Sequence, residues 1–85
     1  MKTILITGAT AGIGEACAKL FAKEKYQLIL TGRRLERLEN LKQSLQSEFG
    51  VNVHLLNFDV QDKTATEKAI DSLPEEFQNI DILLN

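Results

Sequence analysis

The sequence predicts an α/β fold in which helices cover both faces of a parallel sheet. Short apolar runs alternate along its 85 residues with longer stretches of helical period, which is the pattern of successive βα units. The runs are apolar at consecutive positions, as strands buried on both faces require. The expected order is βαβαβαβ, so the chain would form the N-terminal half of a doubly wound sheet in a three-layer α/β/α domain.

The expected strands are the apolar runs at residues 3–7, 27–31, 51–58 and 80–84. The first expected helix starts at Ile13, and its apolar positions recur at helical spacing. Its predicted buried stripe consists of Ile13, Ala16, Cys17, Leu20 and Phe21.

The second expected helix has the clearest apolar stripe in the sequence, and Gly50 is expected to end it. That stripe consists of Leu35, Leu38, Leu41, Leu45 and Phe49. In the third expected helix, Asp62 is the predicted N-cap and Pro74 the predicted end. Its predicted inner face consists of Thr66, Ala69, Ile70 and Leu73.

Composition and charge favour a small-molecule partner. The formal net charge is -2 with acids and bases interleaved, which gives no electrostatic reason to expect nucleic acid or a membrane surface. The apolar runs are too short for a signal peptide or a membrane span, and the single cysteine, Cys17, cannot form an internal disulfide. We therefore expect a soluble, cytoplasmic protein. His54 has no partner at metal-ligand spacing, so no metal site is expected.

The glycine-rich turn at residues 7–14 follows a strand and opens a helix, which is where a parallel sheet binds phosphate. Gly8 permits a tight turn, Gly12 lets the backbone approach a pyrophosphate, and Gly14 allows close packing of helix on strand. The alternative is a glycine-rich turn that binds nothing. The residues predicted to bind a dinucleotide here are Gly8, Ala9, Thr10, Ala11, Gly12, Ile13 and Gly14.

The end of the second strand indicates which dinucleotide is bound. An acidic residue at this place would bind the ribose 2′-hydroxyl of NAD, but the chain has Arg33 and Arg34. Guanidinium groups there can make charge-assisted contacts to the 2′-phosphate of NADP. NADP is therefore the predicted cofactor, and NAD is the less favoured one. The alternative is that both arginines merely sit exposed at a helix start, where their charge is slightly unfavourable.

The glycine-rich turn lacks the GK[ST] ending of a phosphate-binding P-loop, which disfavours a nucleoside triphosphatase. Its spacing, TGxxxGxG, resembles the glycine motif of the short-chain dehydrogenase/reductase family. Asp59-Val60 and the segment Asp81 to Asn85 resemble two further motifs of that family. The resemblance covers the whole chain and implies a Rossmann-type fold. It also implies that Asp59 contacts adenine, that the backbone at Val60 helps, and that Asn85 supports the cofactor. Two plainer roles remain open: Asp59 as a partner for turn N–H groups, and Asp81 as a polar start to a strand.

The resemblance implies reversible hydride transfer between NADP and an alcohol or carbonyl. In that family the serine, tyrosine and lysine that perform the chemistry lie in the second half of the domain. We therefore expect no catalytic residue in residues 1–85, which would be the NADP-binding half, inactive alone, with no second domain and the remainder absent from the chain. The only tyrosine, Tyr26, is predicted to be a packing residue.

The segments TGRRLERLENL and SLPEEFQNIDILLN are similar to the branch of the family that acts on serine and other small 3-hydroxy acids. The resemblance implies a full-length parent that forms a homo-oligomer. An alternative from another class is a noncatalytic nucleotide-binding or interaction module that pairs through the apolar open edge at residues 80–84. A flavodoxin-like domain would need a Ser- and Thr-rich phosphate loop, which the turn lacks.

Overall fold

The computed structural model describes residues 1–9, 11–59 and 61–84, and within these ranges the chain forms a four-stranded parallel sheet. The strands lie in the spatial order β3-β2-β1-β4, and every neighbouring pair is parallel. Their bounds are β1 (Thr3–Ile6), β2 (Gln27–Gly32), β3 (Val53–Asn57) and β4 (Ile82–Leu84). The predicted fold class and the βαβαβαβ order are confirmed.

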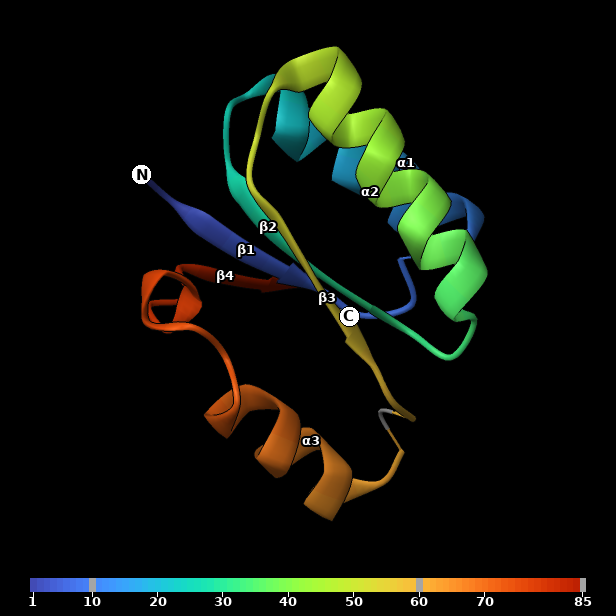
Figure 1. Ribbon diagram of the computed structural model, residues 1–85, viewed down its shortest axis with the longest axis vertical. Coiled ribbons are helices and arrows are strands. Elements are labelled where there is room, and N and C mark those ends of the chain that lie inside the picture. Colours follow the sequence, from blue (N-terminus) through green and yellow to red (C-terminus); the bar gives the residue numbers. More distant parts are fainter. Residues whose placement is uncertain (10, 60, 85) are drawn as a thin grey trace.

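Helices cover both faces of the sheet, with α1 and α2 on one face and α3 on the other (Figure 1). Their bounds are α1 (Gly12–Lys23), α2 (Leu35–Phe49) and α3 (Lys63–Asp71), followed by the short 3-10 helix η1 (Glu75–Phe77). The larger core lies between the sheet and the α1–α2 layer, where Leu28 and Leu30 of β2 meet Leu38 and Leu45 of α2. The smaller core, on the other face, consists of Leu5, Ile29, Leu56, Leu73 and Phe77.

The predicted inner face of α1 is wrong by about a third of a turn. Ile13 is 84% exposed and Leu20 is 58% exposed, whereas Ala18 and Ala22 are fully buried. Gly14 packs against the preceding turn and sets the rotation of the helix, so the positions four and eight residues later face the core. Of the predicted stripe, Cys17 and Phe21 pack partly against the core, and Ala16 is exposed.

The observed burial of α2 and the N-cap of α3 agree better with the sequence predictions than the burial of α1 does. In α2 the predicted leucines are buried from Leu38 onward, but Leu35, in the first turn, is exposed. Gly50 ends this helix in the left-handed conformation, with φ of 67°. Asp62 caps α3 as predicted, because its side chain accepts a hydrogen bond from the backbone N–H of Ala65 at 3.1 Å.

The end of α3 differs from the prediction. The helix ends at Asp71, before Pro74 is reached. Pro74 is instead the N-cap residue of η1, and a proline is tolerated at the start of a helix because no helical hydrogen bond needs its N–H. Ile70 is exposed rather than inward, and the buried contact with the sheet comes from Leu73. Among the described residues, no helix is long and apolar enough to cross a membrane.

The strands β3 and β4 are shorter than the apolar runs that predicted them. Before β4, Asp81 holds Thr3 by two hydrogen bonds: the backbone N–H of Thr3 donates to Oδ2 of Asp81 at 2.8 Å, and the N–H of Asp81 donates to the Thr3 carbonyl at 2.9 Å. Asp81 is thus a polar start to the strand, one of the two roles left open. Leu83 at the free edge of β4 is 62% exposed.

Candidate functional site

The carboxyl ends of β1, β2 and β3 bring three of the predicted segments together. A cleft of about 280 Å³ lies between the glycine-rich turn after β1, the arginine pair after β2 and the turn after β3. It is lined by Gly8, Ala11, Gly32, Arg33, Arg34, Phe58, Asp59 and Gln61. Gly32, Phe58 and Gln61 were not predicted. Their positions at or just beyond the ends of two parallel strands are the signal that could have found them, because those ends share one edge of the sheet.

The glycine-rich turn is held by backbone hydrogen bonds on both sides. The N–H of Ala9 donates to the carbonyl of Thr31 at 3.1 Å, and the N–H of Ala11 donates to the carbonyl of Gly8 at 3.1 Å. Gly8 has a φ of 64°, a conformation that disfavours side chains with a Cβ. Ala9 is fully buried in the core, so this predicted site residue holds the turn in place rather than lining the cleft.

Each glycine of the turn has a different local reason to be glycine. A Cβ on Gly14 would stand 2.3 Å from the carbonyl oxygen of Gly8, so packing of helix on turn requires glycine there. A Cβ on Gly12 would meet nothing within 4 Å, and Gly12 does not have a positive φ. Neither conformation nor packing therefore accounts for Gly12, which is exposed at the first turn of α1, next to Ala11 of the cleft, and does not itself line the cleft.

The first turn of α1 begins directly after Ala11, which lines the cleft. Its N-cap is Ala11, whose side chain cannot accept a hydrogen bond. The leading N–H groups of an α-helix have no carbonyl partner within the helix, and the helix dipole places partial positive charge beside them. The turn therefore suits an anionic group without any charged side chain.

The arginine pair adds full positive charge on the β2 side of the cleft. Arg33 and Arg34 are exposed, and Arg34 is the N-cap residue of α2. In the described part of the chain neither guanidinium has an acidic partner within ion-pair distance. Both are therefore free to bind an anion in the cleft that they line.

On the β3 side, the carboxylate of Asp59 organises the turn. Its Oδ1 accepts a hydrogen bond from the backbone N–H of Gln61 at 3.0 Å, and its carbonyl accepts from the N–H of Asp62 at 3.0 Å. The plainer role predicted for Asp59, as a partner for turn N–H groups, is thus filled by one carboxylate oxygen. Phe58 packs partly against the smaller core and also lines the cleft.

The remaining predicted site residues lie elsewhere. Thr10, Val60 and Asn85 are outside the described residues. Ile13 is on the exposed side of α1 and does not line the cleft. Tyr26 packs edge-on against Phe21, with ring centroids 4.9 Å apart, as expected of a packing residue.

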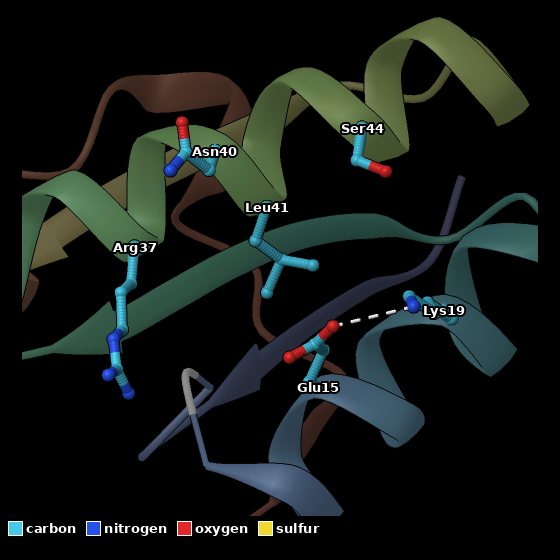
Figure 2. Close-up of a pocket in the computed structure, with 6 residues that line it drawn as sticks. All are labelled: Glu15, Lys19, Arg37, Asn40, Leu41 and Ser44. Atoms are coloured by element: carbon cyan, nitrogen blue, oxygen red, sulfur yellow. Dashed lines mark ion pairs between the residues drawn. The ribbon is translucent and has the colours of Figure 1, made fainter.

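A second hollow, of about 330 Å³, lies between α1 and α2 and is shown in Figure 2. Arg37 and Leu41 point from α2 toward α1, where Lys19 and Glu15 form an ion pair with an N–O distance of 3.4 Å. No sheet edge or glycine turn contributes to its lining. It is a polar groove between helices, separate from the predicted site.

Comparisons with known proteins all point to one family. The family model for short chain dehydrogenases matches residues 2–85. Serine 3-dehydrogenase of Agrobacterium fabrum is 53% identical over 83 residues, covering 98% of this chain and 32% of the relative. Sulfoacetaldehyde reductase of Chromohalobacter salexigens is 49% identical over 82 residues, covering 96% of this chain and 32% of the relative.

Among solved structures, an alcohol dehydrogenase from the archaeon Thermococcus sibiricus, complexed with 5-hydroxy-NADP, superposes with a TM-score of 0.91. It is 37% identical to this chain, and the match covers 98% of this chain and 35% of that one. The chain thus spans about a third of the length of the relatives it matches.

Proposed function

Because the chain belongs to the short-chain dehydrogenase family, we propose that its cleft binds NADP and that the whole protein is an NADP-dependent oxidoreductase. The observation that carries the proposal is one cleft lined on one side by Gly8 and Ala11 of the glycine-rich turn and on the other by two arginines that form no ion pair among the described residues. A dinucleotide phosphorylated on its ribose needs both features, because it carries a pyrophosphate and a separate 2′-phosphate.

The pyrophosphate would lie against the first turn of α1. Gly12 gives it room, and the N–H groups of the helix start would donate to its oxygens. Gly8 and Gly14 hold the shape of the turn, with the buried Ala9 anchoring it to the end of β2. Thr10, Ala11 and Ile13 complete the proposed phosphate-binding segment.

The 2′-phosphate would lie against Arg33 and Arg34. A guanidinium group forms paired, charge-assisted hydrogen bonds to a phosphate, and these are worth more than bonds between neutral groups. NAD lacks this phosphate, so the same arginines would contribute little to its binding. NADP is therefore the proposed cofactor and NAD the weaker ligand.

The adenine would lie toward the β3 turn. Asp59 has one oxygen occupied by the N–H of Gln61, and we propose that its carboxylate and the backbone at Val60 contact the base. Phe58 adds an apolar surface to the same wall. Asn85 is proposed to support the cofactor from the end of β4.

NADP, when bound, would supply or accept the hydride exchanged with an alcohol or carbonyl substrate. No catalytic residue is proposed within residues 1–85, whose part is to bind and orient the cofactor. The proposed substrate is a small 3-hydroxy acid such as serine, which the similarity to serine 3-dehydrogenase supports. Sulfoacetaldehyde reductase is nearly as similar, so a small anionic aldehyde is the competing substrate class. That the whole protein forms a homo-oligomer and is located in the cytoplasm remains a prediction.

Isothermal titration calorimetry with NADP and with NAD tests the cofactor proposal. The wild-type protein should bind NADP more tightly, and Arg33→Ala should weaken NADP binding by roughly 1.5–3 kcal/mol while leaving NAD binding nearly unchanged. Arg37→Ala is the matched control, because Arg37 is an exposed arginine in the first turn of α2, just after the arginine pair, but lines the α1–α2 groove. Equal losses for both cofactors in Arg33→Ala would contradict the assignment. Turnover of serine and of sulfoacetaldehyde by the whole protein, followed by NADPH absorbance, separates the substrate classes.

A further inference from the structure

The side chain of Asn57 closes the hydrogen-bond ladder between β2 and β3 at their carboxyl ends. Asn57 pairs in register with Gly32, and its Nδ2 donates to the Gly32 carbonyl oxygen at 2.8 Å. Near the start of this ladder the bonds are between backbone groups: Leu28 pairs with Val53, and its N–H donates to the carbonyl of the preceding residue at 3.0 Å.

This register identifies the backbone position beside which the Asn57 side chain bonds. In a parallel ladder, a residue bonds to the neighbours on both sides of its partner. Since Leu28 bonds in this way, so should every second residue of β2, and the next donor to the Gly32 carbonyl would be the N–H of Phe58. The amide of Asn57 supplies a side-chain donor to that same carbonyl of a buried glycine, at the point where the chain leaves the sheet.

The bond joins two walls of the cleft. Gly32 directly precedes Arg33, so its carbonyl helps to set the direction in which the chain enters the arginine pair. On the other strand, Phe58 turns to line the cleft, and Asp59 begins the turn closed by Gln61. Asn57 itself does not line the cleft, so any effect on a ligand passes through these neighbours.

We propose that Asn57 is a positioning residue that sets the preference for NADP over NAD by holding the arginine pair against the β3 turn. The inference rests on the proposed function, because it presumes that Arg33 and Arg34 bind the 2′-phosphate. The bond is local to the carboxyl edge of the sheet, so its loss changes the cleft more than the core.

The test is calorimetric binding of NADP and NAD to Asn57→Leu, which keeps the approximate size of the side chain and removes the donor. NADP affinity should fall roughly three- to tenfold, the value of one hydrogen bond, with a smaller loss for NAD. Asn57→Gln retains an amide donor and should recover most of the preference. If Asn57→Leu does not fold by circular dichroism, Asn57→Ser provides the same comparison with a side chain too short to reach.

Asn52→Leu is the matched control. Asn52 links the same two strands at their amino ends, where its Nδ2 donates to Oε1 of Gln27 at 3.4 Å. Its loss should change stability without changing the ratio of NADP to NAD affinity. A wild-type ratio in Asn57→Leu, together with a reduced ratio in Arg33→Ala, overturns this inference alone. A wild-type protein that binds neither cofactor overturns the proposed function and this inference with it.

Discussion

The Cα of Gly14 lies against the carbonyl oxygen of Gly8, so closely that a Cβ built on Gly14 would stand 2.3 Å from that oxygen. The contact joins the first turn of α1 to the glycine-rich turn after β1. Because the opposing atom belongs to the backbone, it cannot move aside as a flexible side chain would. This contact sets how α1 is rotated on the sheet and how close its amino end comes to the cleft.

Gly14→Ala is therefore expected to destabilise the protein. The added methyl group overpacks a backbone contact, and the free energy of unfolding should fall by about 1–3 kcal/mol. Urea unfolding followed by circular dichroism measures it. An unfolding midpoint equal to that of the wild type would show that the backbone of the turn can shift to accommodate the added methyl group.

Gly12→Ala is the matched variant, because a Cβ there meets nothing in the structure. Alanine is also the better helix former, so stability should be unchanged or rise by up to about 1 kcal/mol. NADP affinity should nevertheless fall at least about tenfold, because the methyl group would occupy the place of the pyrophosphate. Unchanged NADP affinity in this stably folded variant would contradict the proposed phosphate position.

The comparison between Gly14 and the rest of α1 shows what the sequence could predict. A strand, a glycine-rich turn and a helix could be recognised because chain conformation depends on local residue types. The buried face of α1 could not, since two apolar faces compete and the Gly14 contact selects the one with Ala18 and Ala22. Apolar periodicity does not contain that tertiary contact.

The candidate site divides in the same way. Arg33, Arg34 and Asp59 could be predicted because they come just after the predicted strands, and strand ends carry the ligand site in such sheets. The role of Asn57 depends on its register with Gly32 across two strands, which no spacing along the chain reveals.

Thr31→Val should stabilise the protein. Thr31 is fully buried, and its Oγ1 has no hydrogen-bond partner among the described residues. Valine has nearly the same shape and no hydroxyl to desolvate, so the free energy of unfolding should rise by about 1 kcal/mol. Thr3→Val is the control, because Oγ1 of Thr3 accepts from Nε2 of Gln27 at 3.2 Å and its loss should lower stability. Equal destabilisation in both variants would mean that the Thr31 hydroxyl is bonded in solution.

Lys25 combines a strained backbone with a helix-capping contact. Its φ is 65°, and its Nζ donates to the carbonyl of Phe49 at the end of α2, at 2.6 Å. Lys25→Met loses the hydrogen bond and keeps the strain, whereas Lys25→Gly loses both. The glycine variant should therefore be more stable than the methionine variant by about 1 kcal/mol, the cost of a left-handed residue with a Cβ. Thermal unfolding of the two variants measures the difference. A methionine variant more stable than the glycine variant would contradict the claim that the backbone at Lys25 is strained.

His54 should make stability depend on pH. It is half-buried in β3, and its ring centroid lies 5.2 Å from that of Phe77. Burial lowers the pKa of His54 below its usual 6.5, and the charge of Lys42 lowers it further, although Glu76 acts in the opposite direction. The folded state therefore binds this proton less readily than the unfolded state does. The contribution of neutral His54 to stability is complete above pH 6.5 and is lost as the pH falls below that value toward the folded pKa.

Urea unfolding at about pH 7.5 and about pH 5.5 should show lower stability at the acidic end, with a smaller decrease in His54→Gln, which cannot titrate. All other titratable groups are common to the two proteins, so the difference between them isolates the histidine. An identical decrease in wild type and variant would mean that protonation of His54 costs the folded state nothing.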